Sequence, residues 1–173
     1  MGLAAAIGYE IKPSNAAQRA MQQVASSKPG AWAFSKVLHH ADRGLHRLTK
    51  GRFTVPAIVA GLPVVMVTTT GARSGQARTM PLLAIPVGDD LAIIGTNFGQ
   101  TSTPGWVYNL EADPHATVTY QDREAAVVAR QATDDEFVVA FTAAAKVYPG
   151  YDKYRERISG REVRVFVLEP EAA

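Results

Sequence analysis

The spacing of apolar positions changes near Gly51 and divides the chain into a helical part and a strand-rich part. Residues 14–26 open with Ser, which favours helix N-termini, and are rich in the helix formers Ala, Gln and Met. Over residues 31–50, apolar side chains recur at helical spacing, while Lys, Arg and His occupy mostly the other faces. The pattern therefore predicts two helices, of which the second is basic and amphipathic.

Beyond Gly51, short runs rich in β-branched residues alternate with turn residues, which is typical of strands. The turns at residues 88–90 and 121–123 are too short for a parallel crossover, so neighbouring strands are expected to pair antiparallel. Six strands with few exposed edges predict an α+β fold, a six-stranded and mostly antiparallel barrel with flanking helices. The expected strands are residues 64–70, 78–87, 91–96, 115–120, 124–131 and 162–168.

Two further helices are expected between these strands. One begins near Thr103 and Pro104, which suit the N-cap and the first helical position, and ends before Pro114. The other begins at Thr133 with a capping box and runs through Lys146.

Length and composition indicate one domain over residues 1–173, with 1–30 as an N-terminal extension, 31–50 as the basic helix and 51–170 as the barrel core. The chain has no cysteine, which excludes disulfides and thiolate metal sites and favours a reducing cytoplasm. Its net charge of +2 is too small to predict a nucleic-acid partner. The four histidines show no metal-ligand spacing, so no metal site is expected.

Membrane association depends on the basic helix at residues 31–50. No apolar run approaches the ~20 residues needed to span a bilayer, and the N-terminus lacks the basic start of a signal peptide. The helix either packs its apolar stripe on the domain or contacts a membrane surface. The chain is therefore expected in the cytoplasm, with peripheral contact to the membrane face as the alternative.

The stretch TTTGARSGQAR joins two apolar runs and carries a high density of polar groups. Gly71 and Gly75 permit positive φ and close backbone approach, so several N–H groups are expected to point into one concavity. Ser74 adds a hydroxyl, and Arg73 and Arg78 add positive charge. The loop is therefore either a phosphate cradle or a solvated hairpin, and its glycine spacing is not that of a Walker loop.

Two later stretches also offer polar groups to a ligand. After TNFGQTSTPG, Trp106 follows a helix N-terminus and is either core or a surface for a flat ring, and Asn109 shares its face. In VYPGYDKY, Tyr148, Tyr151 and Tyr154 either pack over the barrel or donate hydrogen bonds and protons to a carbonyl or nitro oxygen. The Pro-Gly pair before Tyr151 favours an exposed turn and hence the functional interpretation.

Five stretches carry a resemblance to a known family: GARSGQARTMPLLAI, LAIIGTNFG, TPGWVYNLEADP, YPGYDKY and REVRVFVLEP. Together, and in this order, they resemble the deazaflavin-dependent nitroreductases, which use reduced coenzyme F-420 and fold as a split β-barrel of the FMN-binding kind. The resemblance extends from about Leu38 to Pro170 and leaves the first thirty or so residues outside.

The resemblance implies a role for each matching residue. The arginine loop matches contacts to the phosphate side of the coenzyme, made by Arg73, Ser74, Gly75, Gln76 and Arg78. The positions beside the ring are Pro81 and Leu82, and the strand end near the ring is Thr96 and Asn97. The helix that closes the groove carries Trp106 and Asn109. The tyrosines that border the substrate pocket, and are the catalytic candidates, are Tyr148, Tyr151 and Tyr154. Ala72 and Phe98 depart from the family pattern, which often has a basic and a small residue there.

These matches predict a reductase in which reduced coenzyme F-420 gives a hydride to an electron-poor acceptor such as a quinone, an enone or a nitroaromatic. The cofactor carries the difficult step, so the absence of a catalytic triad is no objection. A tyrosine, or water held by one, is expected to protonate the product. The alternatives are an FMN-using split-barrel oxidoreductase and a non-catalytic protein that binds the deazaflavin or a quinone. The physiological acceptor and the oligomeric state stay open.

Overall fold

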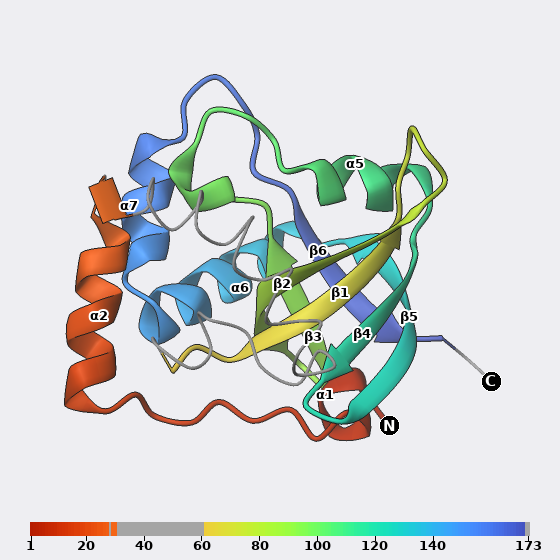
Figure 1. The fold of residues 1–173 in the computed structure, drawn as a ribbon, viewed down its shortest axis with the longest axis horizontal. Coiled ribbons are helices and arrows are strands. Elements are labelled where there is room, and N and C mark those ends of the chain that lie inside the picture. Colours follow the sequence, from red (N-terminus) through yellow and green to blue (C-terminus); the bar gives the residue numbers. More distant parts are fainter. Residues whose placement is uncertain (28, 31–60, 172–173) are drawn as a thin grey trace.

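The computed structural model describes residues 1–27, 29–30 and 61–171. Its centre is a closed barrel of six antiparallel strands in the order β1-β2-β3-β6-β5-β4, which confirms the predicted fold class (Figure 1). The strands are β1 (Val64–Thr70), β2 (Ala77–Val87), β3 (Asp90–Ile94), β4 (His115–Tyr120), β5 (Arg123–Gln131) and β6 (Val165–Pro170). The predicted basic helix at residues 31–50 lies outside the described residues.

Helices surround this barrel on several sides (Figure 1). They are α1 (Leu3–Ala6), α2 (Ala16–Ser26), the short 3-10 helix η1 (Asn97–Gly99), α5 (Gly105–Ala112), α6 (Asp134–Val147) and α7 (Gly150–Arg157). In Figure 1, α2 and α7 lie together at the left, and α5 lies at the upper right. Among the described helices, none has both the length and the apolar character needed to cross a membrane.

Local signals in the sequence locate most of these elements. The Thr133 capping box is confirmed, because the Thr133 hydroxyl accepts from the Glu136 N–H at 3.3 Å and the Glu136 carboxylate accepts from the Thr133 N–H at 2.9 Å. Glu136 also accepts from Arg130 of β5 at 2.7 Å, and the hydrogen bonds from Arg130 first and from Thr133 second lower the pKa of Glu136 to about 2. The capping box and this ion pair together fix the start of α6 on the barrel.

Several predicted boundaries are wrong by a few residues; the strand predicted over residues 91–96, for example, ends at Ile94. The side chain that caps α2 belongs to Asn15, whose oxygen accepts from the Gln18 N–H at 2.8 Å. The helix α5 begins one residue later than predicted, because Pro104 itself is extended and serves as the N-cap. The last strand begins at Val165 instead of residue 162, because its partner β3 ends at Ile94, which pairs with Val165.

Barrel closure gives the sheet an inner and an outer face, and both are covered. The inner face holds one apolar cluster, and α6 and α7 cover a second cluster on the outer face. Successive residues of β3 contribute alternately, so that Leu91 and Ile93 enter the inner cluster while Ala92 and Ile94 enter the outer one. This double burial explains why β3 reads as a continuous apolar run in place of an alternating one.

The N-terminal segment contributes Leu3, Ile7 and Tyr9 to the inner apolar cluster, although it lies outside the family resemblance. Leu3 and Ile7 are fully buried there, and the Leu3 N–H donates to the Asp90 carboxylate at 2.9 Å. The Tyr9 hydroxyl donates to the Pro63 carbonyl at 3.0 Å and also contacts the Ala84 carbonyl. The N-terminal segment therefore closes one end of the barrel.

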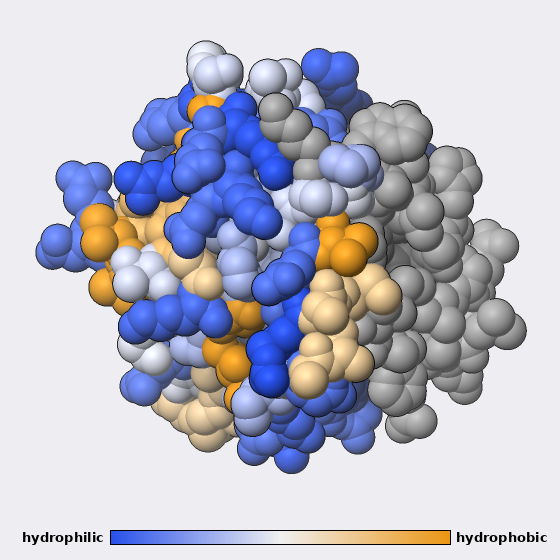
Figure 2. Space-filling view, turned by 90° about the vertical axis from the view of Figure 1, so that its left-hand side faces the viewer, coloured by the Kyte–Doolittle hydropathy of each residue, from blue (hydrophilic) through white to orange (hydrophobic). Residues whose placement is uncertain are grey.

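Exposed apolar side chains do not form one continuous patch on the face shown in Figure 2. There, apolar residues lie as separate spots among hydrophilic ones. Over the described surface, the exposed large apolar residues of the outer helices are Met21, Val24, Tyr108, Val138 and Val139.

Truncation of Leu3 tests the contribution of the N-terminal segment to stability. Leu3→Ala is expected to lower the free energy of unfolding by about 2–4 kcal/mol, because it leaves a cavity in the inner cluster. Ile11→Ala is the matched control, since Ile11 is 41% exposed and lies in the same segment. Urea denaturation measures both variants; equal midpoints for Leu3→Ala and wild type would show that the segment does not stabilise the barrel.

Candidate functional site

The arginine loop connects β1 to β2 at the tip of a regular hairpin, in which Thr70 pairs with Ala77. The loop closes on itself, because the Gly71 N–H donates to the Gln76 carbonyl at 2.9 Å and the Gly75 N–H donates to the Gly71 carbonyl at 2.7 Å. The expected cradle of backbone N–H groups is therefore wrong, since these donors are used inside the turn. What the loop offers to solvent are side chains.

Arg73, Ser74, Gln76 and Arg78 are all exposed around this loop. Among the described residues, no carboxylate forms an ion pair with Arg73 or Arg78. Within the described part of the chain, the Arg78 guanidinium makes long contacts of 3.4 Å to the Ser74 hydroxyl and the Gln76 amide oxygen. Gly75 has φ +63° and open space where a Cβ would stand. The tip is thus an accessible pair of guanidinium groups with a hydroxyl between them.

Asn109 of α5 holds the arginine loop in place through two hydrogen bonds. Its amide nitrogen donates to the Thr69 hydroxyl at 2.9 Å, and its amide oxygen accepts from the Ala72 N–H at 3.0 Å. Thr69 is only 2% exposed. Both hydrogen bonds reach across about forty residues of sequence, so the resemblance identified Asn109 but not its partner Thr69.

The strand end predicted to lie near the ring has an unusual backbone. Thr96 is buried, and Asn97 and Phe98 follow with φ values of +47° and +56°, which non-glycine residues rarely adopt. The Asn97 amide donates to the carbonyl and hydroxyl oxygens of Ser102, both at 3.0 Å. The Phe98 ring meets the edge of Tyr154, with centroids 6.3 Å apart. This loop therefore joins the strand end to the tyrosine helix.

All three predicted catalytic tyrosines are buried in the outer apolar cluster. Tyr148 precedes α7, Tyr151 and Tyr154 lie within it, and neighbouring rings meet edge to face with centroids about 6 Å apart. The hydroxyls of Tyr148 and Tyr154 are 3.0 Å apart. The exposed turn expected before Tyr151 is wrong, because Gly150 is buried against the Tyr148 ring at the start of α7.

Burial raises the pKa of the Tyr148, Tyr151 and Tyr154 phenols above the ordinary value. The neighbouring tyrosines add to this effect for Tyr148 and Tyr151. A phenol with a raised pKa stays neutral and is a poor acid, although it still donates a hydrogen bond. The geometry therefore favours these tyrosines as neutral hydrogen-bond donors and packing groups.

Pro81 and Leu82 lie on opposite faces of β2. Leu82 packs against the inner cluster together with Met80, whereas Leu83, next to it, packs against the outer cluster with the tyrosines. Since side chains alternate along a strand, Pro81 shares the outer face. Trp106 is 6% exposed and meets the Phe166 ring at 5.9 Å inside the barrel, which fits the core interpretation of its indole.

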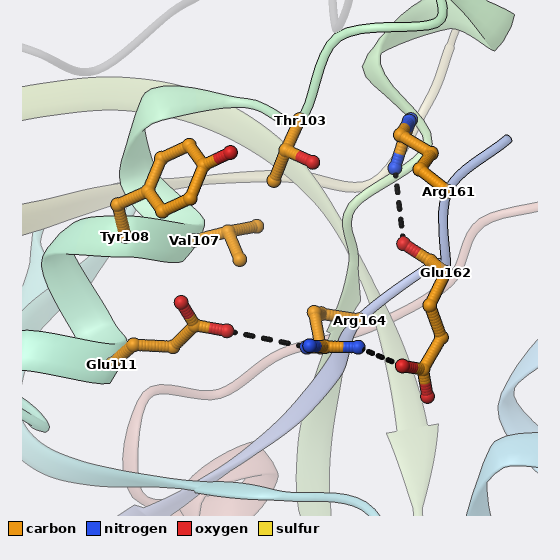
Figure 3. Close-up of a pocket in the computed structure, with 7 residues that line it drawn as sticks. All are labelled: Thr103, Val107, Tyr108, Glu111, Arg161, Glu162 and Arg164. Carbon is orange, nitrogen blue, oxygen red and sulfur yellow. Dashed lines mark hydrogen bonds and ion pairs between the residues drawn. The ribbon is translucent and has the colours of Figure 1, made fainter.

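A cavity of about 190 Å³ lies beside α5, but it contains none of the predicted site residues. Figure 3 shows its lining side chains, including Arg164, which donates to Glu111 at 3.2 Å and also pairs with Glu162. Typical ligand pockets measure ~300–1,000 Å³. We therefore do not place a cofactor there.

The arginine loop, Asn109 and the Thr96–Asn97 strand end lie instead at one end of the barrel, here called the upper rim. Pro81 and Leu82 lie within β2, and the tyrosines lie in the outer cluster beside that end, where Phe98 meets Tyr154. At this end β1 stops at Thr70, β3 stops at Ile94 and β6 starts at Val165. In Figure 1, the β1–β2 hairpin tip, α5, η1 and α7 follow one another across the upper side of the molecule. The arginine loop thus presents exposed guanidinium groups, and the opposite end of the rim adjoins the buried tyrosines, with Arg157 over the Tyr154 ring.

The closed six-stranded barrel with its flanking helices belongs to the α+β class, with the architecture of a split barrel. Comparison with known proteins gives the family. The sequence profile of the F420H(2)-dependent quinone reductases matches residues 43–170. The chain belongs to this family, which confirms the resemblance seen in the sequence.

Individual relatives agree with this assignment. An F420H(2)-dependent quinone reductase of Mycobacterium tuberculosis is 32% identical over 93 residues, which are 54% of this chain and 60% of that protein. The match thus spans less than two thirds of that relative.

Among solved structures, an F420-H2 dependent reductase (FDR-A) is 30% identical with a TM-score of 0.56, covering 62% of this chain and 94% of that one. A domain-swapped dimer is 27% identical with a TM-score of 0.58, covering 82% of this chain and 100% of that one.

The raised tyrosine pKa values predict a loss of stability at alkaline pH. Unfolded tyrosine ionises near pH 10, whereas the buried phenols keep their protons to higher pH. Their contribution is therefore complete below about pH 10 and is lost as the pH rises through the native pKa. Urea denaturation between about pH 8 and pH 11 should show a shallower decline for Tyr148→Phe than for wild type. The control is Tyr108→Phe at an exposed position, and equal slopes in all three proteins would contradict the prediction.

Proposed function

We propose that the chain is an oxidoreductase that uses reduced coenzyme F-420 to transfer a hydride to a quinone. Family membership over residues 43–170 is the observation that carries this proposal, since the family is defined by dependence on the reduced coenzyme. The upper rim supports this proposal, because it carries the exposed arginines of the loop and adjoins the buried tyrosines. A ligand with an anionic group and a flat ring suits such an arrangement.

The arginine loop fits the phosphate side of the coenzyme. Arg73 and Arg78 have no carboxylate partner among the described residues, and guanidinium groups bind phosphate through charge-assisted hydrogen bonds. Ser74 and Gln76 add polar groups beside them, and Gly75 leaves the approach open. In this proposal the loop binds the anion through side chains, and Asn109 acts mainly by holding the loop in place.

The ring side of the coenzyme is assigned to Pro81 and to the strand end at Thr96 and Asn97. Leu82 and Trp106 support this wall from inside the barrel, where both pack in the inner cluster. The bound coenzyme supplies the hydride, so the protein provides binding, orientation and exclusion of water. The role of these residues is thus to hold two reactants at a fixed separation.

The acceptor is assigned to the tyrosine end of the rim, where enones and nitroaromatics are candidates besides quinones. The hydroxyls of Tyr148 and Tyr154 are within hydrogen-bond distance of each other, so one of them can also donate to an acceptor oxygen. Because burial raises their pKa, we assign the protonation of the product to water, and the phenols orient the acceptor.

We also propose that the protein acts in the cytoplasm and meets lipophilic quinones at the membrane face. The support is the basic amphipathic pattern at residues 31–50 of the sequence. Cosedimentation with anionic vesicles at low and high salt tests this; protein that stays in the supernatant at low salt would exclude a membrane role.

An anaerobic assay with reduced coenzyme F-420 and menadione tests the proposed function. The enzyme is expected to restore the absorbance of the oxidised coenzyme faster than the uncatalysed reaction does. Saturable coenzyme binding without turnover would favour a non-catalytic binding protein. Tight binding of FMN with no affinity for the deazaflavin would favour a flavin-using split-barrel oxidoreductase.

The arginine loop should contribute to coenzyme affinity more than to chemistry. Arg73→Ala and Arg78→Ala each remove a charge-assisted contact worth ~1.5–3 kcal/mol, which is roughly a tenfold to hundredfold rise in the dissociation constant. Fluorescence titration with the coenzyme measures this effect, and added salt should weaken wild-type binding in the same direction. Arg123→Ala serves as a control, because Arg123 begins β5 away from the loop. Wild-type affinity in both loop variants would contradict the proposed phosphate contact and favour the interpretation of the loop as a solvated hairpin.

A further inference from the structure

Arg161 uses its whole guanidinium group on backbone carbonyls. It lies between α7 and β6, and four of its five N–H donors point to the loop that follows β3. They donate to the carbonyl oxygens of Gly95 and Thr96, each at 3.0 Å, and twice to that of Gln100, at 3.2 and 3.3 Å. The fifth donates to the Glu162 carbonyl at 3.4 Å. The guanidinium therefore has no N–H left for a ligand.

The charge of Arg161 has no carboxylate partner among the described residues. Partial burial lowers the pKa of Arg161 from the ordinary value of arginine. Arg164, three residues on, differs in this respect, because it pairs with both Glu111 and Glu162 (Figure 3). The hydrogen bonds of Arg161 therefore hold the loop after β3 in its conformation, whereas the contacts of Arg164 are ordinary ion pairs.

The loop that Arg161 holds is conformationally unfavourable. Asn97 and Phe98 both have positive φ without being glycine, a state that persists only where the surroundings impose it. On its other side the loop packs against α7, since a Cβ on Gly99 would stand 3.2 Å from the Tyr154 Cα. Arg161 and Tyr154 thus confine the loop from two directions.

We infer that Arg161 is a positioning residue, which fixes the Thr96–Asn97 strand end relative to the tyrosine helix and so sets the separation of coenzyme and acceptor. The inference rests on the proposed function, because it assigns the ring to that strand end. Lysine cannot replace Arg161 here, since a single ammonium cannot reach the carbonyls of Gly95, Thr96 and Gln100 together. Arg161 donates to backbone carbonyls at the upper rim, so its proposed effect on the reaction passes through the loop.

The test compares Arg161→Lys with Arg164→Lys, which keeps the same change of side chain on the same segment. Hydrogen–deuterium exchange reports on the loop itself and needs no coenzyme. In Arg161→Lys, exchange is expected to be about tenfold faster or more at the Gly99 and Gln100 amides, which bond within the loop. Peptides of the arginine loop should keep wild-type exchange. Arg164→Lys should match wild type in both regions.

Kinetics then separate positioning from binding. With menadione as acceptor, kcat of Arg161→Lys is expected to fall about tenfold to a hundredfold, because the reactants are misplaced. The coenzyme dissociation constant should stay within about threefold of wild type, since the phosphate contacts are kept. This split is the reverse of that expected for the Arg73 and Arg78 variants.

Three results would overturn the inference. These are wild-type exchange in the loop of Arg161→Lys, faster exchange with unchanged kcat, and a variant that fails to fold while Arg164→Lys folds, which would make the role global. If wild type itself shows no turnover of the coenzyme, the proposed function is wrong, and Arg161 then has no role in positioning the reactants. The exchange data would then still decide whether Arg161 holds the loop, so the two failures are distinguishable.

Discussion

Closure of the barrel is the constraint on which the rest of the structure depends. The strand β1 pairs with β2 on one side and with β4 on the other, so that Met66 lies opposite both Pro81 and Thr119. Every strand edge is thereby paired, and the sheet acquires an inner face that the N-terminal segment closes and an outer face that α6 and α7 cover. The same register brings the β1–β2 hairpin, the end of β3 and the start of β6 to one rim.

The upper rim combines two electrostatic environments. At the hairpin the guanidinium groups of Arg73 and Arg78 are exposed, and solvent screens their charge until an anion binds. At the other end, Tyr148 and Tyr154 are buried and neutral, since the loss of water raises their pKa. Such a gradient suits a ligand that is charged at one end and apolar at the reacting end. The proposed hydride transfer takes place beside these neutral phenols, with Arg157 next to the Tyr154 ring.

Side-chain amides and guanidinium groups set the shape of the rim loops. Asn109 joins α5 to Thr69 and to the Ala72 N–H, and Arg161 joins the start of β6 to the loop after β3. In both cases one polar side chain satisfies several groups from a distant part of the chain. Loops held in this way keep a defined conformation without lengthening a strand or helix. The barrel fixes where the rim loops start and end, and Asn109 and Arg161 determine the conformation of these loops.

The sequence alone determined the elements whose signals are local. The strands β1 and β4, the Thr133 capping box and the antiparallel pairing all follow from spacing, propensity and turn length. The polar stretches of the sequence also located the arginine loop and the tyrosines, and the resemblance then implied a role for each. Only the tertiary structure decided that Tyr151 is buried and that Arg161 spends its donors on backbone carbonyls. Burial and hydrogen-bond partners depend on residues far away along the chain, and periodicity reports only on near neighbours.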